Sequence, residues 1–425
     1  MTKKILLASC IGSMLEMFDF YIYATFLNVM ASTFFPTENK ILSLFISVGG
    51  WGIALIAHPI GALIFGYFGD IFGRKNTFAF TLIFMSFPTI IIGILPSYNE
   101  IGIIAPIIVI TGRLIQGICY GGELNGAFIF ALEHMPQKQG LASGLIISSC
   151  VCGILSATAL SYITQLPGMP SWAWRISFCL GGSVGFIGYF IRKKLIESDE
   201  FLRTFSKTKI PLFTIIHKRK TACFLCFSIG ALIGGFFYID FCFLSVYLSR
   251  YCHLPSETIW KLNIYLILSI MSVGPLFGAL YDHLKSPLFL RVMCYGLFFG
   301  TIPVFWLLLS HLAFLFILGG ILLGICTASI STVGFVIMQN LFPVKERYSG
   351  ISLFYCLGIS IYGGISPLFY IEAIEIHNES LFFPAYCLMC LISLFYAALK
   401  INNVTEQNAP IRNDQVFFED IKKAG

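Results

Sequence analysis

The stretch Gly66-Tyr-Phe-Gly-Asp-Ile-Phe-Gly-Arg-Lys75 separates two long apolar segments of the chain. Its three glycines permit a tight turn and close approach of another backbone. Asp70 lies at a predicted helix boundary, where a carboxylate can face the positive end of a neighbouring helix. Arg74 and Lys75 can face the negatively charged cytoplasmic surface of a membrane. Taken alone, the stretch fits either a specific structural loop that contacts a neighbouring helix or an ordinary basic loop. The surrounding sequence must decide between these two interpretations.

That surrounding sequence has the composition of a polytopic membrane protein. Of its 425 residues, 57% are hydrophobic and only 11% are charged, whereas a soluble domain has roughly 25% charged residues. A helix needs about 20 apolar residues to cross a bilayer. We therefore predict an all-α membrane protein with no removable signal peptide and twelve transmembrane helices, at residues 5–29, 43–69, 77–96, 102–132, 140–164, 173–191, 221–249, 260–282, 288–309, 311–341, 349–372 and 380–399.

The formal net charge of +6 is explained by membrane topology, which excludes nucleic acid as a partner. With the N-terminus in the cytoplasm, four basic residues fall on the outer side: Lys40, Arg175, Arg250 and Lys261. Most others fall on the inner side, among them Lys3, Lys4, Arg74, Lys75, Lys138, Arg192, Lys193, Lys194, Lys218, Arg219, Lys220, Lys345, Arg347 and Lys400. This asymmetry predicts that both termini are cytoplasmic.

The two halves of the chain resemble each other weakly. Gly66-Tyr-Phe-Gly-Asp70 ends the second predicted span, and Gly278-Ala-Leu-Tyr-Asp282 ends the eighth. Pro136-Gln-Lys138 follows the fourth span, and Pro343-Val-Lys345 follows the tenth. Agreement in order and membrane side indicates duplication, as in transporters with a midplane site between two halves. We predict six-helix halves at 1–191 and 221–400, a cytoplasmic linker at 192–220 and a cytoplasmic tail at 401–425.

Ionisable side chains lie within two of the predicted spans. Glu16, Asp19 and Tyr23 have helical spacing in the first. In the fourth, polar side chains lie within about 80° of arc: Arg113, Gln116, Tyr120 and Glu123. Because lipid chains cannot form hydrogen bonds with polar side chains, each polar stripe should face a cavity or another helix. Charged groups inside a membrane cost free energy and are candidate functional residues.

The three carboxylates outnumber Arg113, the single permanent cation of these stripes. Negative charge would remain in a region of low dielectric constant, so at least one acid is expected to bind a proton near neutral pH. Arg113 can bind a substrate carboxylate with two parallel hydrogen bonds. The hypothesis is that Arg113 holds this group while Asp19 or Glu123 carries the proton. The alternative is a structural ion pair of Arg113 with Glu123 or Asp19.

Other candidates lie outside the two stripes. Asp240, deep in the seventh span, is either a proton-coupling residue or a helix-packing acid. His58 is a packed polar residue or a substrate or gating contact. Aromatic residues in the seventh and eleventh spans are candidates to line the cavity: Tyr238, Tyr247, Phe354 and Tyr355. Glu133 and His134, at the cytoplasmic end of the fourth span, are expected to be solvated. The sequence contains no nucleotide-binding loop, catalytic triad or zinc motif, so no enzyme activity, cofactor or metal is expected.

The stretch quoted first resembles the signature loop of the major facilitator superfamily, with Ile71 in place of a usual basic residue. Other motifs resemble its metabolite:proton symporter family, which includes proline/glycine-betaine, α-ketoglutarate, citrate and shikimate permeases. They are Glu16-Met-Phe-Asp-Phe20, Arg113-Leu-Ile-Gln-Gly117, Gly121-Gly-Glu123, Trp174-Arg-Ile-Ser-Phe178, Leu195-Ile-Glu-Ser-Asp-Glu-Phe201, Arg347-Tyr-Ser-Gly350 and Gly363-Gly-Ile-Ser-Pro367.

This resemblance implies the major facilitator fold, a bacterial inner membrane location and alternating access. It also implies a gating loop, here Gly66, Asp70, Gly73, Arg74 and Lys75, with Asp282 in the second half. The chain departs from the family at His58, where an arginine is usual, and at Asn340, where an acid is usual. We expect a monomer that imports a small organic carboxylate or zwitterion with a proton. The alternatives are an exporter of a carboxylate-rich metabolite, siderophore or drug, and a membrane sensor that does not transport.

Overall fold

The computed structural model describes residues 2–193, 197, 201–202, 212–250, 252–284, 286–310, 312–363, 370 and 382–401. Most of the predicted linker 192–220 lies outside the described residues. So do residues 402–425 of the predicted tail and the last four positions of the motif that begins at Gly363.

The described chain is built of helices joined by short connections. The N-terminal part contains α1 (Thr2–Thr25), α2 (Leu27–Phe34), α3 (Lys40–Phe72), α4 (Arg74–Ile94), α5 (Tyr98–Ile101), α6 (Ile104–His134), α7 (Gln139–Thr164) and α8 (Trp174–Lys193). After α10 (Leu212–Lys218) come α11 (Lys220–Tyr238), the π-helix η1 (Ile239–Phe243), α12 (Leu244–Arg250), α13 (Ser256–Leu284), α14 (Pro287–Leu308), α15 (Ala313–Leu341), α16 (Arg347–Gly358), the π-helix η2 (Ile359–Gly363) and α18 (Phe382–Ile401).

Each predicted span coincides with a helix or with consecutive helices, and the eleventh is described as far as Gly363. Among the described residues, eight helices are long and apolar enough to cross a membrane. Large apolar side chains cover the outside of the bundle, with Phe314 75% exposed and Ile56 73% exposed. Such a surface is stable in contact with lipid chains. The prediction of an all-α membrane fold is confirmed.

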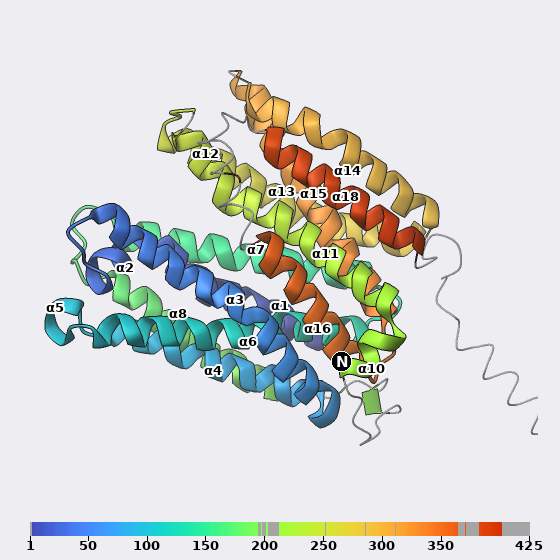
Figure 1. Cartoon of the computed structure of the whole chain (residues 1–425), viewed down its shortest axis with the longest axis horizontal. Helices are drawn as coiled ribbons and strands as arrows, with labels where there is room; N and C mark the ends of the chain where they lie inside the picture. Colours follow the sequence, from blue (N-terminus) through green and yellow to red (C-terminus); the bar gives the residue numbers. More distant parts are fainter. Residues whose placement is uncertain are drawn as a thin grey trace, which may run out of the picture.

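The helices form two groups (Figure 1). Helices α1 to α8 lie together, α11 to α15 lie together with α18, and α16 lies between the groups in contact with α11 and α3. The groups meet where α7 packs on α13 and where α3 packs on α16. Glycines permit the first crossing, because a Cβ atom on Gly140 or Gly144 would collide with the carbonyl of Gly278 or Gly274. These crossings position the groups described next.

Candidate functional site

The C-terminal end of α3 holds the start of α16. The Asp70 carboxylate accepts the backbone N–H groups of Tyr348 at 3.2 Å and Ser349 at 2.9 Å. These N–H groups belong to the first turn of α16, which has no earlier helical carbonyl to pair with them. Gly66 and Gly69 make the approach possible, since a Cβ on Gly69 would collide with the Tyr348 ring. As predicted for Asp70, a carboxylate meets the positive end of a neighbouring helix.

The equivalent contact occurs on the other side of the interface. The Asp282 carboxylate, near the end of α13, accepts the N–H groups of Gly140 and Leu141, each at 2.8 Å. Both amides lie in the first turn of α7. Each half of the chain thus supplies one aspartate that caps a helix of the other half. The sequence echo between Asp70 and Asp282 corresponds to a repeated contact that joins the halves.

Glu133 connects the signature loop with the second half. Its carboxylate forms ion pairs with Arg74, in the loop, and with Arg347, at the start of α16. Arg74 Nη2 also donates to the Val344 carbonyl at 2.7 Å, again across the interface. The prediction that Glu133 is solvated is wrong, because its side chain is fully buried. Its position at the end of a predicted span gave no indication of the two arginines, because only the tertiary fold brings them to Glu133.

The rest of the loop is fixed by the residues that follow α8. The Lys75 N–H donates to Glu197 Oε2 at 3.0 Å. Gly73 adopts a φ of +96°, which favours glycine, and Glu197 lies directly against it. The Arg74 guanidinium stacks on the Phe201 ring at 5.3 Å. The loop, Glu133 and the two aspartates together close one end of the interface between the halves, which we call the inner closure.

Above this closure lies an aromatic layer. The rings of Phe128 on α6 and Phe335 on α15 stack in parallel with 3.6 Å between centroids. Tyr355 of α16 lies 5.1 Å from the Phe335 ring. These residues come from both halves, and Phe335 and Tyr355 also line the cavity described next.

The cavity has a volume of about 50 Å³ and is lined by side chains of both halves, among them Phe20, Tyr120, Tyr238, Thr327 and Tyr355. Ligand pockets are commonly about 300–1,000 Å³, so this space is smaller than a usual ligand pocket. Three predicted substrate contacts line this space: Tyr120, Tyr238 and Tyr355. Tyr247 instead packs on Phe243, and neither Tyr247 nor Phe354 is among the lining residues.

Arg113 lies beside the cavity with its charge enclosed by aromatic rings. Its Cζ atom is 4.5 Å from the Tyr23 ring centroid and 5.0 Å from that of Phe20, a residue of the cavity wall. Nη1 donates to Gln116 Oε1 at 2.9 Å, and Gln116 donates to Thr89 at 2.6 Å. Nε and Nη2 have no hydrogen-bond partner among the described residues, and no described carboxylate forms an ion pair with Arg113. Two buried donors are thus available.

Arg192 joins the intramembrane acids, which the sequence analysis did not foresee. It lies next to the end of α8, yet its side chain is 1% exposed and forms an ion pair with Glu123. Gly12 of α1 leaves room for it, since a Cβ there would collide with the guanidinium. Glu123 is therefore paired with Arg192 and not with Arg113. The count of one cation for three acids is corrected to two cations for three acids.

The other two acids are buried without an ion pair among the described residues. Glu16 is 0% exposed, accepts no hydrogen bond from the described residues and has Glu123, Arg192 and Asp19 as charged neighbours. Asp19 is 5% exposed and lies within electrostatic range of Arg113, near Thr89 and Gln116. If all three acids were ionised, the five charges would sum to −1. One bound proton would make the cluster neutral.

Two further candidates are placed away from this cluster. His58 stacks on Tyr120 with 4.5 Å between ring centroids, behind the cavity wall. Asp240 lies in η1, is fully buried and contacts Thr327 Oγ1 at 2.6 Å. In the described part of the chain, no group of three histidine, cysteine or acidic residues is arranged to hold a metal ion.

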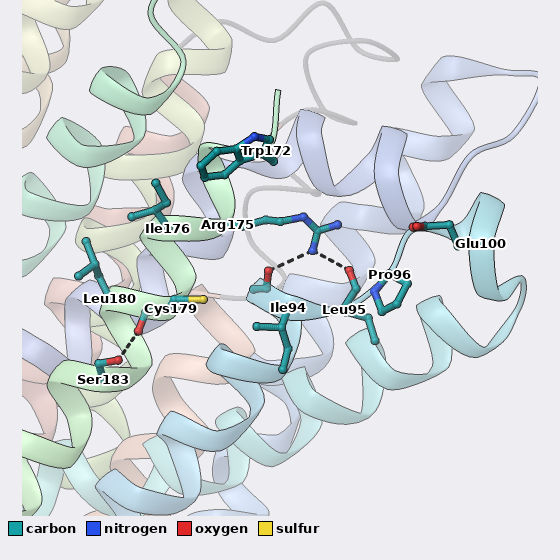
Figure 2. Close-up of a pocket in the computed structure, with 11 residues that line it drawn as sticks. Ile94, Leu95, Pro96, Glu100, Trp172, Arg175, Ile176, Cys179, Leu180 and Ser183 are labelled. Atoms are coloured by element: carbon teal, nitrogen blue, oxygen red, sulfur yellow. Dashed lines mark hydrogen bonds between the residues drawn. The ribbon is translucent and has the colours of Figure 1, made fainter. Parts of the chain in front are cut away.

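A larger pocket, of about 650 Å³, lies between α4, α5 and α8. Figure 2 shows Arg175 within it, donating hydrogen bonds of 3.0 Å and 2.6 Å to the carbonyls of Gly93 and Leu95. The same guanidinium stacks on Trp174 at 4.6 Å. Because Arg175 satisfies the last carbonyls of α4, its role is to join the outer ends of two helices. This pocket is separate from the central cavity.

Sequence reasoning missed Arg192, Phe20, Thr89 and Thr327. A signal existed for Arg192, which is the penultimate residue of a 20-residue helix and so falls within the length of a membrane span. It was outweighed by the Arg-Lys-Lys run that is typical of an inner loop. The other three are ordinary apolar or hydroxyl residues whose importance comes from tertiary contacts.

Comparison with known proteins agrees with this architecture. The family model described as Major Facilitator Superfamily matches residues 9–367. A putative proline/betaine transporter of Staphylococcus aureus (strain COL) is 31% identical over 376 residues, covering 86% of this chain and 81% of the relative. The glycine betaine/proline/ectoine/pipecolic acid transporter OusA of Dickeya dadantii is 27% identical, covering 92% and 81%. The proline/betaine transporter of Salmonella typhimurium is 26% identical, covering 99% and 87%.

Solved structures share the fold. The proton:xylose symporter XylE bound to 6-bromo-6-deoxy-D-glucose superposes with a TM-score of 0.75 at 14% identity, covering 94% of this chain and 95% of that one. The human organic anion transporter MFSD10 gives 0.71 at 13% identity, covering 95% and 99%. The predicted twelve-helix fold and the resemblance to proline/betaine permeases are confirmed, and these relatives are membrane transporters rather than enzymes.

Proposed function

Because the chain belongs to the major facilitator superfamily, we propose that this polytopic membrane transporter imports a small zwitterion, which carries a carboxylate and a cationic nitrogen, together with a proton. The observation that carries the proposal is the state of Arg113. Its guanidinium is buried beside the cavity, has two unused donors and forms no ion pair in the described chain. A substrate carboxylate can accept from both donors. Phe20 covers the guanidinium from the cavity side, so its ring must move when the substrate binds.

The cavity wall supports the cationic part of the substrate. Phe20, Tyr120, Tyr238 and Tyr355 supply aromatic rings from both halves, and the lining contains no acidic residue. Rings without a carboxylate favour quaternary or bulky ammonium groups, which bind by cation–π attraction. Glycine betaine, named for the Dickeya dadantii relative, and proline, named for several relatives, each combine a cationic nitrogen with a carboxylate. They are the first substrates to test.

Charge balance supplies the coupling to protons. Asp19 lies within electrostatic range of Arg113, so a bound substrate carboxylate competes with it for the same cation. The carboxylate also adds one negative charge to a cluster that already has an excess of acids. A proton bound by Glu16, Asp19 or Glu123 offsets that charge where the dielectric constant is low. Glu16 is the first choice, because Glu123 is paired with Arg192 and Asp19 lies near Arg113.

The experiment measures uptake of radiolabelled glycine betaine and proline into proteoliposomes with an imposed inside-alkaline gradient. Accumulation that a protonophore abolishes is expected for the wild type. Arg113→Ala should lose uptake, whereas Arg175→Ala is the control, a partly buried arginine outside the central cavity. Thermal melting of both variants checks folding. Uptake that persists in Arg113→Ala, or that is independent of the proton gradient, contradicts the proposal. Proton-driven accumulation inside inverted vesicles instead supports the exporter.

The remaining proposals concern placement. We infer a bacterial inner membrane location, cytoplasmic termini, a cytoplasmic linker between two six-helix halves and a monomeric unit. They are supported by the basic residues gathered at the inner ends of the helices and by a cavity that needs only one chain. Tags at each terminus that a protease removes only from inverted vesicles would agree with this topology.

A further inference from the structure

The acid in η1 of the C-terminal half forms no ion pair with a cation of the described residues. Asp240 is 0% exposed, and no described lysine, arginine or histidine forms an ion pair with it. On α13, which contacts η1, Lys261 is paired with Glu257 and is exposed. On α15, the titratable neighbour is the thiol of Cys326. An ionised carboxylate in such surroundings has no compensating charge and is costly.

The hydrogen bonds of Thr327 allow a proton on this carboxyl group. Thr327 Oγ1 lies 2.6 Å from Asp240 Oδ2 and 3.1 Å from the Leu323 carbonyl. A threonine hydroxyl has one hydrogen, and a backbone carbonyl can only accept. When Thr327 donates to Leu323 in its own helix, the hydrogen of the second bond comes from Asp240. Both contacts are then satisfied by a carboxylic acid that donates to the threonine oxygen.

The same group has a route to the cavity. Thr327 is part of the cavity wall, whereas Asp240 is not among the lining residues. The acid therefore lies one hydrogen bond behind the surface that the substrate reaches. It also lies in a π-helical turn that interrupts the seventh span between α11 and α12. Such turns are frequent at functional sites, and any change in this turn would change how Asp240 faces Thr327.

We propose that Asp240 is a second proton-binding site, located in the C-terminal half, which exchanges its proton with the cavity through Thr327 as the seventh span changes shape. This inference rests on the proposed proton-coupled transport and adds a site to it. The transported species is the proton, and no other reactant is needed. The alternative is a permanently protonated acid that only holds α11 against α15.

Infrared difference spectroscopy of the purified transporter in lipid separates the two. Spectra recorded between two pH values contain the carboxylic C=O stretch only of groups that gain or lose a proton. One such band should be present in the wild type and absent in Asp240→Asn. Thr327→Val should retain the band at a shifted frequency, because it removes the hydrogen bond but keeps the acid. Glu100→Gln, an exposed acid on the outer side, should leave the band unchanged.

Identical pH-difference spectra for the wild type and Asp240→Asn would overturn the proposal. If Asp240→Asn fails to fold, a band in Thr327→Val at the wild-type frequency overturns it as well. This readout needs no substrate, so it is independent of the proposed function. In proteoliposomes, proton flux per glycine betaine should be lower by one in Asp240→Asn. Absence of proton flux in the wild type would count against proton-coupled transport, whereas equal ratios in the two proteins would count against Asp240.

Discussion

Replacing Glu133 by glutamine should open the end of the interface between the halves at which Glu133 lies. The glutamine has nearly the same size but lacks the charge that pairs with Arg74 and Arg347. Arg74 lies in the same half as Glu133, so that pair persists when the halves separate and its loss affects both states equally. Only the pair with Arg347 crosses the interface. The change in the conformational equilibrium is therefore set by that single buried pair.

Removing one partner of a buried ion pair costs about 3–5 kcal/mol. Taking about 3 kcal/mol, the ratio of open to closed molecules rises roughly 100-fold, since 1.4 kcal/mol corresponds to a factor of ten. The other cross-interface bonds remain, including those of Asp70 and Asp282. The calculated change is thus a shift in population and not a loss of the fold.

Amide hydrogen exchange measures this shift without labels. The N–H groups of Tyr348, Ser349, Gly140 and Leu141 are bonded across the interface, so they exchange when it opens. In Glu133→Gln, peptides covering these turns should exchange roughly 100-fold faster, up to the limit at which the open form predominates. Glu100→Gln is the matched control on the outer side. Unchanged exchange in both first turns would refute the reasoning.

The remaining predictions concern single contacts. Gly12→Ala should lower the melting temperature and impair proton-driven uptake, because the new methyl group collides with the Arg192 guanidinium. Gly49→Ala is the control, since no atom lies within 4 Å of the Cβ position, and it should change neither quantity. Asp70→Asn should speed amide exchange mainly at Tyr348 and Ser349, and Asp282→Asn mainly at Gly140 and Leu141. In each variant the first turn of a helix loses a charged cap worth about 1 kcal/mol. Equal effects of one variant at both turns would contradict the independence of the two caps. Hydrogen bonds from Ser97 lower the pKa of Glu100 below its ordinary value of 4.5, so the cap on α5 is intact well above pH 4.5 and is lost as the pH falls below it. The protection of the 97–102 turn against amide exchange should decrease over the same pH range. Glu100→Gln should abolish this pH dependence.

The sequence was sufficient for the fold because membrane insertion depends on local composition. Span lengths and the side preference of lysine and arginine are read along the chain, without knowledge of contacts. Asp70 was equally accessible, since its position at a helix end beside three glycines already predicts a close neighbour. The contact with α16 then follows from the packing of α3 on that helix.

The partners of the buried charges could not be predicted in the same way. Helical spacing showed that Arg113 and Glu123 share a face of one helix, but not which helices face them. Arg192 and Arg347 lie at span ends, where basic residues are usual, so neither was recognised as buried. To predict that Arg192 contacts Glu123, one must know how α8 is rotated about its axis. To predict that Arg347 contacts Glu133, one must know how the two halves dock.

One residue connects the acid cluster with the inner closure. The Tyr348 N–H donates to Asp70, while its hydroxyl donates to the Gly122 carbonyl at 2.7 Å, next to Glu123. Glu123 and Glu133 also belong to the same helix, about 15 Å apart at 1.5 Å per residue. Any change in the Glu123–Arg192 pair that displaces the Gly122 carbonyl therefore alters a bond of the residue that Asp70 holds. Because Tyr348 is fully buried, it cannot exchange this bond for one to water without separation of α6 and α16. A change of protonation that disturbs the Glu123–Arg192 pair and an opening of the closure would thus both act on the contact of α6 with α16.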